Sequence, residues 1–431
     1  MIDKLRALHH ARGGLALDLT LYLVGTAFAA YTSVLSTLPA HRAWGVIALG
    51  GYAFAASLTT SQLLARTRPA APAGAAPSAD LGVLADAGAL GRAGVVVAAW
   101  VAATIVPLVV QAGQRAGGRP FRAQEEVPVI EDGAARLLDT GTPYLTRDAI
   151  AAAPEPLLGY LPYQPGMTVF GLPRALLGTH WYTDARIWFA LATAAALLAA
   201  LKLLRDAGVA DALLIRGAQV AVLPISALTL ATGGDDLPVL ALCLLTLAGA
   251  ARGRWWLAGL AVGTAAALKL FAWPIAVVLI VYAATRGRGP ATRLALPAVA
   301  LPVGVLLPVI AVAPAAVFEN LVRFPIGDGL VASPAASPLP GHLIAQTLPY
   351  GRPVATGLLL AAGVAIGVWL LRRPPRDAGQ AAVVCAVGLL AAILLLPATR
   401  FGYLLYPVAY AIWIVPLARG TVRHGVPSKS P

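Results

Sequence analysis

Charged residues are scarce in this chain, and their scarcity argues against a soluble globular protein. Asp, Glu, Lys and Arg make up 12% of the 431 residues, whereas a soluble protein carries about a quarter. The two cysteines, Cys243 and Cys385, both lie inside apolar runs, so the sequence offers no disulfide framework and no cysteine metal-ligand pattern. Hydrophobic residues account for 59% of the chain. This excess of apolar surface predicts a protein embedded in membrane lipid.

The motifs of several enzyme and binding classes are also missing. Neither a phosphate-binding P-loop nor a Rossmann glycine fingerprint is present, so the sequence shows no nucleotide-binding motif. There is no cluster of histidines and no EF-hand spacing, so we expect no cofactor and no required metal. The formal charge of +13 comes from short basic clusters between apolar runs. Such clusters indicate membrane topology and not nucleic-acid binding.

The apolar runs predict an all-α polytopic membrane protein with about twelve transmembrane helices and two long extracytoplasmic loops. The runs are mostly about 17 to 23 residues long, which is what an α-helix needs to cross about 30 Å of hydrocarbon. A β-barrel would show short segments of alternating polarity, and that pattern is absent from residues 379–396. The predicted spans are 17–36, 43–65, 93–112, 185–203, 209–230, 236–251, 255–269, 271–285, 294–317, 354–371, 379–396 and 402–418.

Basic residues at alternate junctions orient these spans. Placing the N-terminus in the cytoplasm makes every inner junction basic and leaves the C-terminus inside as well. The apolar stretch 255–285 has Arg on both sides, so a single crossing would invert every later span. We therefore expect two short helices that meet near Lys269, with Pro274 helping to break the helix. No cleavage site follows the first apolar run, so that span is expected to be retained in a plasma-membrane protein.

This topology divides the chain into segments with different roles. Residues 1–66 form a two-span hairpin, 67–92 a Pro- and Ala-rich cytoplasmic linker, 93–418 the main transmembrane domain and 419–431 a cytoplasmic tail. Residues 113–184 and 319–353 form the two long outer loops. Eight acidic residues lie in the first of these loops. Acidic residues contribute little to orientation, so we expect the chemistry on the outer face.

Two acidic pairs and one lysine are the first candidates for a site. Glu125 and Glu126 follow the third span, where a carboxylate could deprotonate an acceptor hydroxyl; a solvated helix cap or a calcium site are the alternatives. Asp235 and Asp236 lie in the turn TGGDDLPV and either bind sugar or acceptor hydroxyls or only cap a helix. Lys269 lies in an apolar run and either faces a polar cavity, where it could bind a donor phosphate, or snorkels to the interface.

Further candidates lie at two other span boundaries. Arg400 in PATRFGYLLYP is not required for topology, and its guanidinium suits phosphate recognition. The aromatic side chains beside it could simply anchor the interface. His180, Asp184 and Arg186 in THWYTDAR form a mixed cluster that either contacts sugar or acceptor or provides interfacial packing.

At these residues the chain resembles the polyprenyl-phosphate-sugar-dependent membrane glycosyltransferases of the GT-C superfamily, and glycosyltransferase family 87 in particular. The similarity covers roughly residues 93–418 and is carried by EVPVI, ARLLDTGTPY, YLPYQPG, TGGDDLPV, ALKLFAWP and TRFGYLLYP. It implies a GT-C-like fold and an Asp or Glu base, which matches Glu126 here, with Glu125 as the neighbouring alternative. Family members more often carry Asp at this position. Spans one and two precede the similar region, and their role is unassigned.

The resemblance implies an inverting transfer of a sugar, with mannose favoured, from a polyprenyl phosphate to a lipid-linked glycan or glycolipid. The expected partners are that donor, that acceptor and membrane lipid, without nucleic acid. A transporter or flippase for a lipid-linked sugar is the alternative, but it predicts internal repeats, and the halves show no convincing repeat. A structural scaffold would leave Lys269 and Arg400 unexplained.

Overall fold

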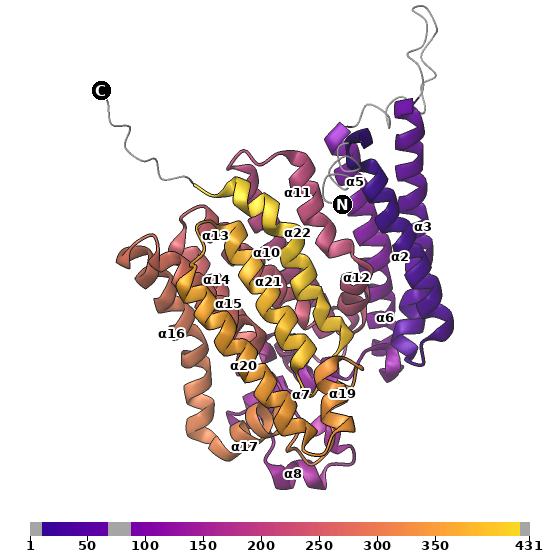
Figure 1. The fold of residues 1–431 in the computed structure, drawn as a ribbon. Coiled ribbons are helices and arrows are strands. Elements are labelled where there is room, and N and C mark those ends of the chain that lie inside the picture. The colour runs from indigo at the N-terminus through magenta and orange to yellow at the C-terminus, as the bar shows by residue number, and fades with distance from the viewer. Residues whose placement is uncertain (1–10, 68–87, 423–431) are drawn as a thin grey trace, which may run out of the picture. The chain divides into compact units, whose positions relative to one another are not determined.

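The computed structural model describes residues 11–67 and 88–422, and these residues form α-helices joined by short turns (Figure 1). Among them the only β-pairing is an isolated parallel bridge between Ala336 and Thr399. Most of the expected linker, 67–92, and most of the expected tail, 419–431, lie outside the described residues. The described helices group into two compact units, which are treated separately below.

Unit 1 comprises residues up to 124 together with 179–190 and 210–234. Its main helices are α2 (Leu15–Leu35), α3 (Pro39–Thr67), α5 (Gly88–Trp100), α6 (Val106–Ala116), α11 (Asp211–Ala218) and α12 (Pro224–Thr232), with the first residues of α10 (Ala185–Arg205). Helices α2 and α3 can approach closely because Gly25 has no side chain. A Cβ at this position would collide with the ring of Tyr52. A five-residue π-helical turn, Val101–Ile105, joins α5 to α6, and its Ala103 carbonyl accepts a 2.8 Å hydrogen bond from the Trp44 indole.

Unit 2 comprises residues 125–178, 191–209 and 235 onward. Its longer helices are α7 (Glu126–Thr140), most of α10, α13 (Asp236–Ala251), α14 (Trp255–Leu268), α15 (Trp273–Ala284), α16 (Arg288–Val312), α20 (Gly351–Arg372), α21 (Ala378–Leu395) and α22 (Leu405–Gly420) (Figure 1). Gly259 and Gly263 let α14 approach α16, since a Cβ at either would collide with α16 backbone carbonyls. Such small residues spaced four apart are how membrane helices pack tightly.

Eight helices in the described residues are long and apolar enough to cross a membrane. They are Leu15–Leu35, Pro39–Ala65, Gly91–Ala116, Ala185–Arg205, Arg288–Val312, Gly351–Arg372, Ala378–Leu395 and Phe401–Gly420. Residues Asp211–Val222 and Pro224–Thr232 form a pair bent by 46°, which brings the number of candidate spans to nine. The chain is therefore an all-helical, multi-pass membrane protein. The twelve expected spans all fall on helices, but α13, α14 and α15 are shorter than the other spans, so twelve crossings are not shown.

The expected helix break near Lys269 is confirmed. Helix α14 ends at Leu268, Lys269 has the extended dihedrals φ −152° and ψ 142°, and a 3₁₀ turn at Leu270–Ala272 leads into α15. Pro274 lies in the first turn of α15, where the missing N–H costs no hydrogen bond. The break leaves the lysine between two helix ends.

The two segments expected as outer loops are folded, and side-chain hydrogen bonds join one to the other. Residues 113–184 contain α7, α8 (Arg147–Ala152) and α9 (Leu172–Leu177), and residues 319–353 contain a π-helical turn, Glu319–Arg323, α18 (Phe324–Ile326) and α19 (Pro340–Thr347). The buried Glu319 carboxylate accepts hydrogen bonds from the Tyr160 hydroxyl at 2.7 Å and from Arg147 at 3.0 Å. The Asn320 side chain accepts from the backbone N–H of Leu161 at 2.8 Å. These contacts fix the chain beside Tyr163.

Candidate active site

The first part of the site is an ion pair between Glu126 and Arg400. Glu126 is the first residue of α7, and Arg400 precedes the 3₁₀ turn Phe401–Leu404 that leads into α22. The Arg400 guanidinium donates to the Glu126 carboxylate, and the two side chains keep 31% and 12% of their surface exposed. Glu125 is exposed and forms no ion pair with the residues that the structure describes. Burial and the nearby Glu126 charge raise the pKa of Glu125.

The second part is a buried triad of Lys269, Asp235 and Asp236. The Lys269 ammonium donates to Asp235 Oδ2 and to Asp236 Oδ1, each at 2.6 Å, and only 7% of Lys269 is exposed. The Tyr406 hydroxyl donates to the same Asp236 oxygen at 2.8 Å. Lys269 therefore points inward and does not snorkel. Asp235 is the N-cap residue of α13, yet its side chain makes no capping hydrogen bond, so the carboxylates serve the lysine and not the helix end.

Aromatic rings surround the lysine, and most of them were not identified as site residues from the sequence. The Lys269 ammonium lies 5.3 Å from the ring centroid of Tyr163, 5.5 Å from that of Tyr403 and 5.9 Å from that of Phe271, distances at which cation–π attraction acts. Burial, followed by the charges of Asp235 and Glu126, raises the pKa of Tyr163 well above its usual value. Because both carboxylates act on this one phenol, the ion pair and the triad are neighbours.

Two α-helix N-termini and the starts of two short 3₁₀ turns meet at this cluster. Glu125 is the N-cap residue of α7, Asp235 that of α13, Lys269 that of the turn before α15, and Arg400 that of the turn before α22. The N-terminus of an α-helix carries a partial positive charge and unsatisfied N–H groups. The arrangement therefore combines two basic side chains with helix ends that favour an anion.

The two carboxylates of the triad outnumber its ammonium, and the proton affinity of Asp235 reflects that excess. Burial raises the pKa of Asp235 to about 6, with Lys269 opposing the shift and the Asp236 and Glu126 charges adding to it. A buried carboxyl that titrates near neutral pH is typical of functional sites. In the described part of the chain no group of three or more His, Cys, Asp or Glu side chains is arranged to hold a metal ion.

His180, Asp184 and Arg186 belong to unit 1 and are not part of this cluster. Both Asp184 oxygens accept from the Arg186 guanidinium at 2.8 Å, and Arg115 adds a third contact at 3.1 Å. Arg186 also donates to the backbone carbonyls of Arg122 and Ala231. Burial alone would raise the pKa of Asp184, but the two arginines outweigh it and hold the pKa well below its usual range. The predicted role of these residues in substrate binding stays a prediction.

These features define a multi-pass membrane protein that holds a cluster of paired charges within its helical body. Glycosyltransferase family 87 matches residues 160–397, which is more than half of the chain. The protein belongs to this family and is a membrane glycosyltransferase. The matched range contains Tyr163, Lys269 and both triad aspartates, while Glu126 lies 34 residues before it and Arg400 three residues after it. No curated protein and no solved structure gives a significant match to the chain.

Proposed function

We propose that this protein transfers a sugar, with mannose the expected one, from a polyprenyl phosphate to a hydroxyl of a lipid-linked glycan or glycolipid. The observation that carries the proposal is the meeting of Lys269, Arg400 and Glu126 at the N-termini of α7 and α13. Family membership supports a transferase over a transporter or flippase for the same lipid. The absence of nucleotide-binding motifs favours a lipid phosphate as the leaving group.

The donor phosphate is expected to bind beside Lys269 and Arg400. Lys269 is buried and Arg400 is partly buried, and their attraction for an anion is stronger there than at a fully exposed surface. Arg400 is paired with Glu126 in the structure. An incoming phosphate would compete for the guanidinium and release the Glu126 carboxylate. Donor binding would thereby turn an ion-paired carboxylate into a free base.

The proposed reaction is a single inverting displacement. The bond between the anomeric carbon and the phosphate oxygen breaks, and polyprenyl phosphate leaves with the bonding electrons. The acceptor oxygen forms the new bond to the anomeric carbon while its proton passes to Glu126. Lys269 and Arg400 stabilise the charge that develops on the departing phosphate.

Asp235 and Asp236 have oxygens suited to sugar hydroxyls. The ammonium of Lys269 uses Asp235 Oδ2 and Asp236 Oδ1, and the second oxygen of each carboxylate could accept from the sugar. The rings of Tyr163 and Tyr403 lie against the same lysine and offer apolar faces on which a sugar can stack. Donor phosphate and sugar would then be held by one continuous set of side chains.

We further propose that α13, α14 and α15 also cross the membrane, giving twelve spans, with both termini in the cytoplasm and the site at the outer face of the plasma membrane. Cysteines placed at Thr140 and Gly289, both exposed positions, test this topology. An impermeant thiol reagent should label T140C but not G289C in intact cells. Labelling with the opposite preference would overturn it.

The decisive experiment uses purified protein and a synthetic polyprenyl-phosphate sugar. Transfer to a glycolipid acceptor, or slow release of free sugar, is the expected result. A matched reaction with a nucleotide sugar should give no product. Turnover with the nucleotide sugar alone would reject the lipid donor, and transport of the lipid without cleavage would reject the transferase.

A further inference from the structure

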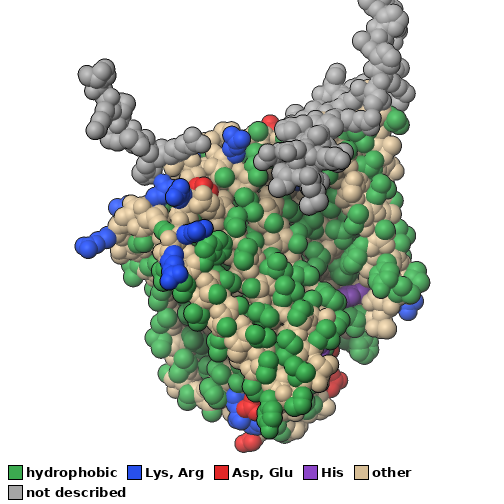
Figure 2. Space-filling view, viewed as in Figure 1, with side chains coloured by type: hydrophobic (Ala, Val, Ile, Leu, Met, Phe, Trp, Pro, Cys, Tyr) green, Lys and Arg blue, Asp and Glu red, His purple; other side chains and the backbone are tan. Residues whose placement is uncertain are grey.

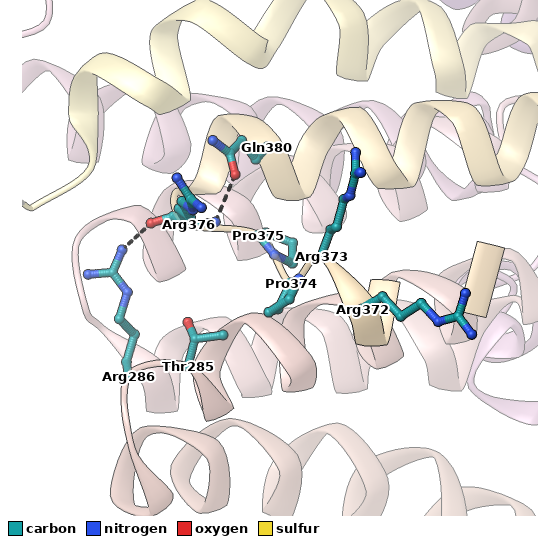
Figure 3. A pocket seen from close by; sticks show the side chains of 8 residues that line it. All are labelled: Thr285, Arg286, Arg372, Arg373, Pro374, Pro375, Arg376 and Gln380. Atoms are coloured by element: carbon teal, nitrogen blue, oxygen red, sulfur yellow. Dashed lines mark hydrogen bonds between the residues drawn. The ribbon is translucent and has the colours of Figure 1, made fainter. Parts of the chain in front are cut away.

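A hollow lined by arginines lies in unit 2 and shares no residue with the candidate active site. It has a volume of about 840 Å³ and is lined by Thr285, Arg286, Arg372, Arg373, Pro374, Pro375, Arg376 and Gln380 (Figure 3). A second hollow of about 510 Å³ shares Arg286 and Arg376 with the first and adds Arg419. The two together form one basic recess between the end of α15 and the connection from α20 to α21.

The recess has more positive charge than the neighbouring protein neutralises. In the part of the chain that the structure describes, no carboxylate pairs with Arg372, Arg373 or Arg376. Asp377 lies at the rim, but its side chain caps α21 by accepting from the backbone N–H of Gln380 at 2.9 Å. Guanidiniums without a carboxylate partner attract anions, so an anion in the recess would be stabilised by the residues that line it.

The backbone around the recess is held in place. Arg286 donates to the Arg376 carbonyl at 2.6 Å, and the Gln380 side chain accepts from the Arg376 N–H at 2.9 Å, as the dashed lines in Figure 3 show. Pro374 and Pro375 restrict the connection between these contacts. The positive-inside rule explains why basic residues gather at such a junction, but it requires neither a hollow nor a fixed shape.

An apolar helix face leads up to the recess. Leu360, Val364 and Leu371 follow one face of α20 at helical spacing and are 66%, 68% and 72% exposed. Only 11% of the apolar stretch of α20 is buried inside the protein, so this face of the helix contacts lipid. Arg372 directly follows Leu371. In the space-filling view, basic side chains gather at the end of a broad hydrophobic surface (Figure 2).

We infer that the recess binds the phosphate of an anionic phospholipid, with the acyl chains lying along α20. A lipid satisfies both features at once, because its headgroup neutralises the arginines and its chains cover the apolar face. Basic pockets between transmembrane helices are known to suit anionic headgroups. A soluble phosphate would use the arginines but would leave the face of α20 without a role. The inference does not depend on the proposed glycosyl transfer.

The test measures how much phosphatidylglycerol the protein retains. Full-length protein is placed in phosphatidylcholine nanodiscs that contain a small fraction of phosphatidylglycerol, and bound lipid is counted by native mass spectrometry. Each basic residue near a membrane surface contributes about 1 kcal/mol, a factor of about 5, so Arg373→Gln with Arg376→Gln should weaken retention at least about tenfold. The control, Arg288→Gln with Arg293→Gln on α16, removes the same charge outside the recess.

Equal losses in the two Gln variants, or no loss in either, would overturn the inference. Displacement of the lipid by millimolar inorganic phosphate would identify a soluble anion as the ligand and would also overturn it. If the Gln variant inserts incorrectly, Arg373→Lys with Arg376→Lys decides, because it keeps the charge and loses the bidentate geometry. We expect retention to weaken about threefold or more in the Lys variant. Unchanged retention would leave only diffuse attraction and no built site.

Discussion

Two buried charge clusters in this protein use the same kinds of side chain in opposite ways. In unit 1, Asp184 has both oxygens bound by Arg186, and Arg115 adds a further contact. In unit 2, the single ammonium of Lys269 serves both Asp235 and Asp236. The first cluster has two cations for one carboxylate, and the second has two carboxylates for one cation.

The pKa values respond accordingly. The pKa of Asp184 is held well below its usual range although burial opposes this, whereas burial raises that of Asp235 to about 6. A carboxylate whose hydrogen bonds are all used can stabilise the fold but has nothing left for a substrate. A carboxylate that shares one cation is poised to accept further hydrogen bonds or a proton. The balance of charges therefore separates a structural cluster from a candidate site, and five experiments test that separation.

The largest effect should follow from Glu126→Gln. A positioned base contributes about 10² to 10⁴-fold to turnover, and Gln keeps the shape but accepts no proton. We expect turnover to fall by that factor while thermal stability stays close to wild type and donor binding is retained or tightened, because Arg400 no longer pairs with a carboxylate. The matched control is Glu125→Gln, which changes the adjacent and more exposed carboxylate and should be milder. The reverse ranking would assign the base to Glu125.

Arg186→Ala should instead damage the fold. Removing one partner of a buried ion pair leaves an uncompensated charge and costs about 3 to 5 kcal/mol. Both Asp184 and Arg186 are almost completely buried, at 1% and 0% exposure. The expected result is a lower unfolding temperature or poor insertion, with normal turnover per folded molecule. A stable Arg186→Ala protein with lost donor or acceptor binding would place this cluster in the substrate site instead.

Arg400→Gln should weaken donor use without unfolding the protein. A hydrogen bond to a charged group contributes about 1.5 to 3 kcal/mol, so the KM for the donor should rise roughly 10-fold to 100-fold. Arg400 keeps 31% of its side chain exposed. Water can therefore hydrate Glu126 when the guanidinium is removed, and the protein should still fold.

Lys269 requires a compensated variant, because Lys269→Gln alone would leave two buried carboxylates unpaired. Lys269→Gln combined with Asp235→Asn and Asp236→Asn removes all three charges and should fold, with donor use reduced by a similar factor. If both this variant and Arg400→Gln kept wild-type donor kinetics, the proposal that this site binds the donor phosphate would be rejected.

The smallest effect should be a pH dependence from Asp235. With a pKa of about 6, Asp235 takes up a proton as the pH falls through that value. The neutral carboxyl then attracts the Lys269 ammonium less strongly. We expect kcat/KM to halve near pH 6 and to fall further below it, and the Asp235→Asn variant to lack this step. The folded-state pKa lies above that of the unfolded chain, so this group adds stability as the pH falls. A fall in activity accompanied by unfolding would point to other groups.

The membrane architecture was largely predictable from the sequence, because hydrocarbon thickness and charge asymmetry act on contiguous residues. The break at Lys269 followed from Arg286 and the other basic residues around that stretch, which forbid a single crossing. The number of crossings was less secure, since α13, α14 and α15 are apolar but short. Apolar composition identifies a helix that prefers lipid but does not establish that it spans.

The pairing within the site could not be derived from the sequence. Glu126 and Arg400 are separated by 274 positions, and nothing local links them. Tyr163 was quoted as part of YLPYQPG without a role, and only the fold brings its ring to Lys269. Conversely, Asp184 and Arg186 are two residues apart and were predicted as one cluster with His180; the two charged side chains do pair, whereas the His180 ring stacks on Tyr182. Their spacing could not reveal that Arg115 and two carbonyls complete their hydrogen bonds.

The three short helices around the triad have a consequence for the surrounding bilayer. At about 1.5 Å per residue, the 12 residues of α15, which follow the turn after Lys269, extend only about 18 Å, against a hydrocarbon layer of about 30 Å. A lipid-facing helix that is too short makes the bilayer thin locally, at a cost that grows with each ångström of mismatch. If α15 crosses the membrane as proposed, the bilayer should be thinnest beside it, which shortens the distance that a lipid-borne phosphate must descend to Lys269. Reconstitution in lipids of increasing acyl-chain length should slow turnover progressively while the long α16 and α20 remain fully embedded.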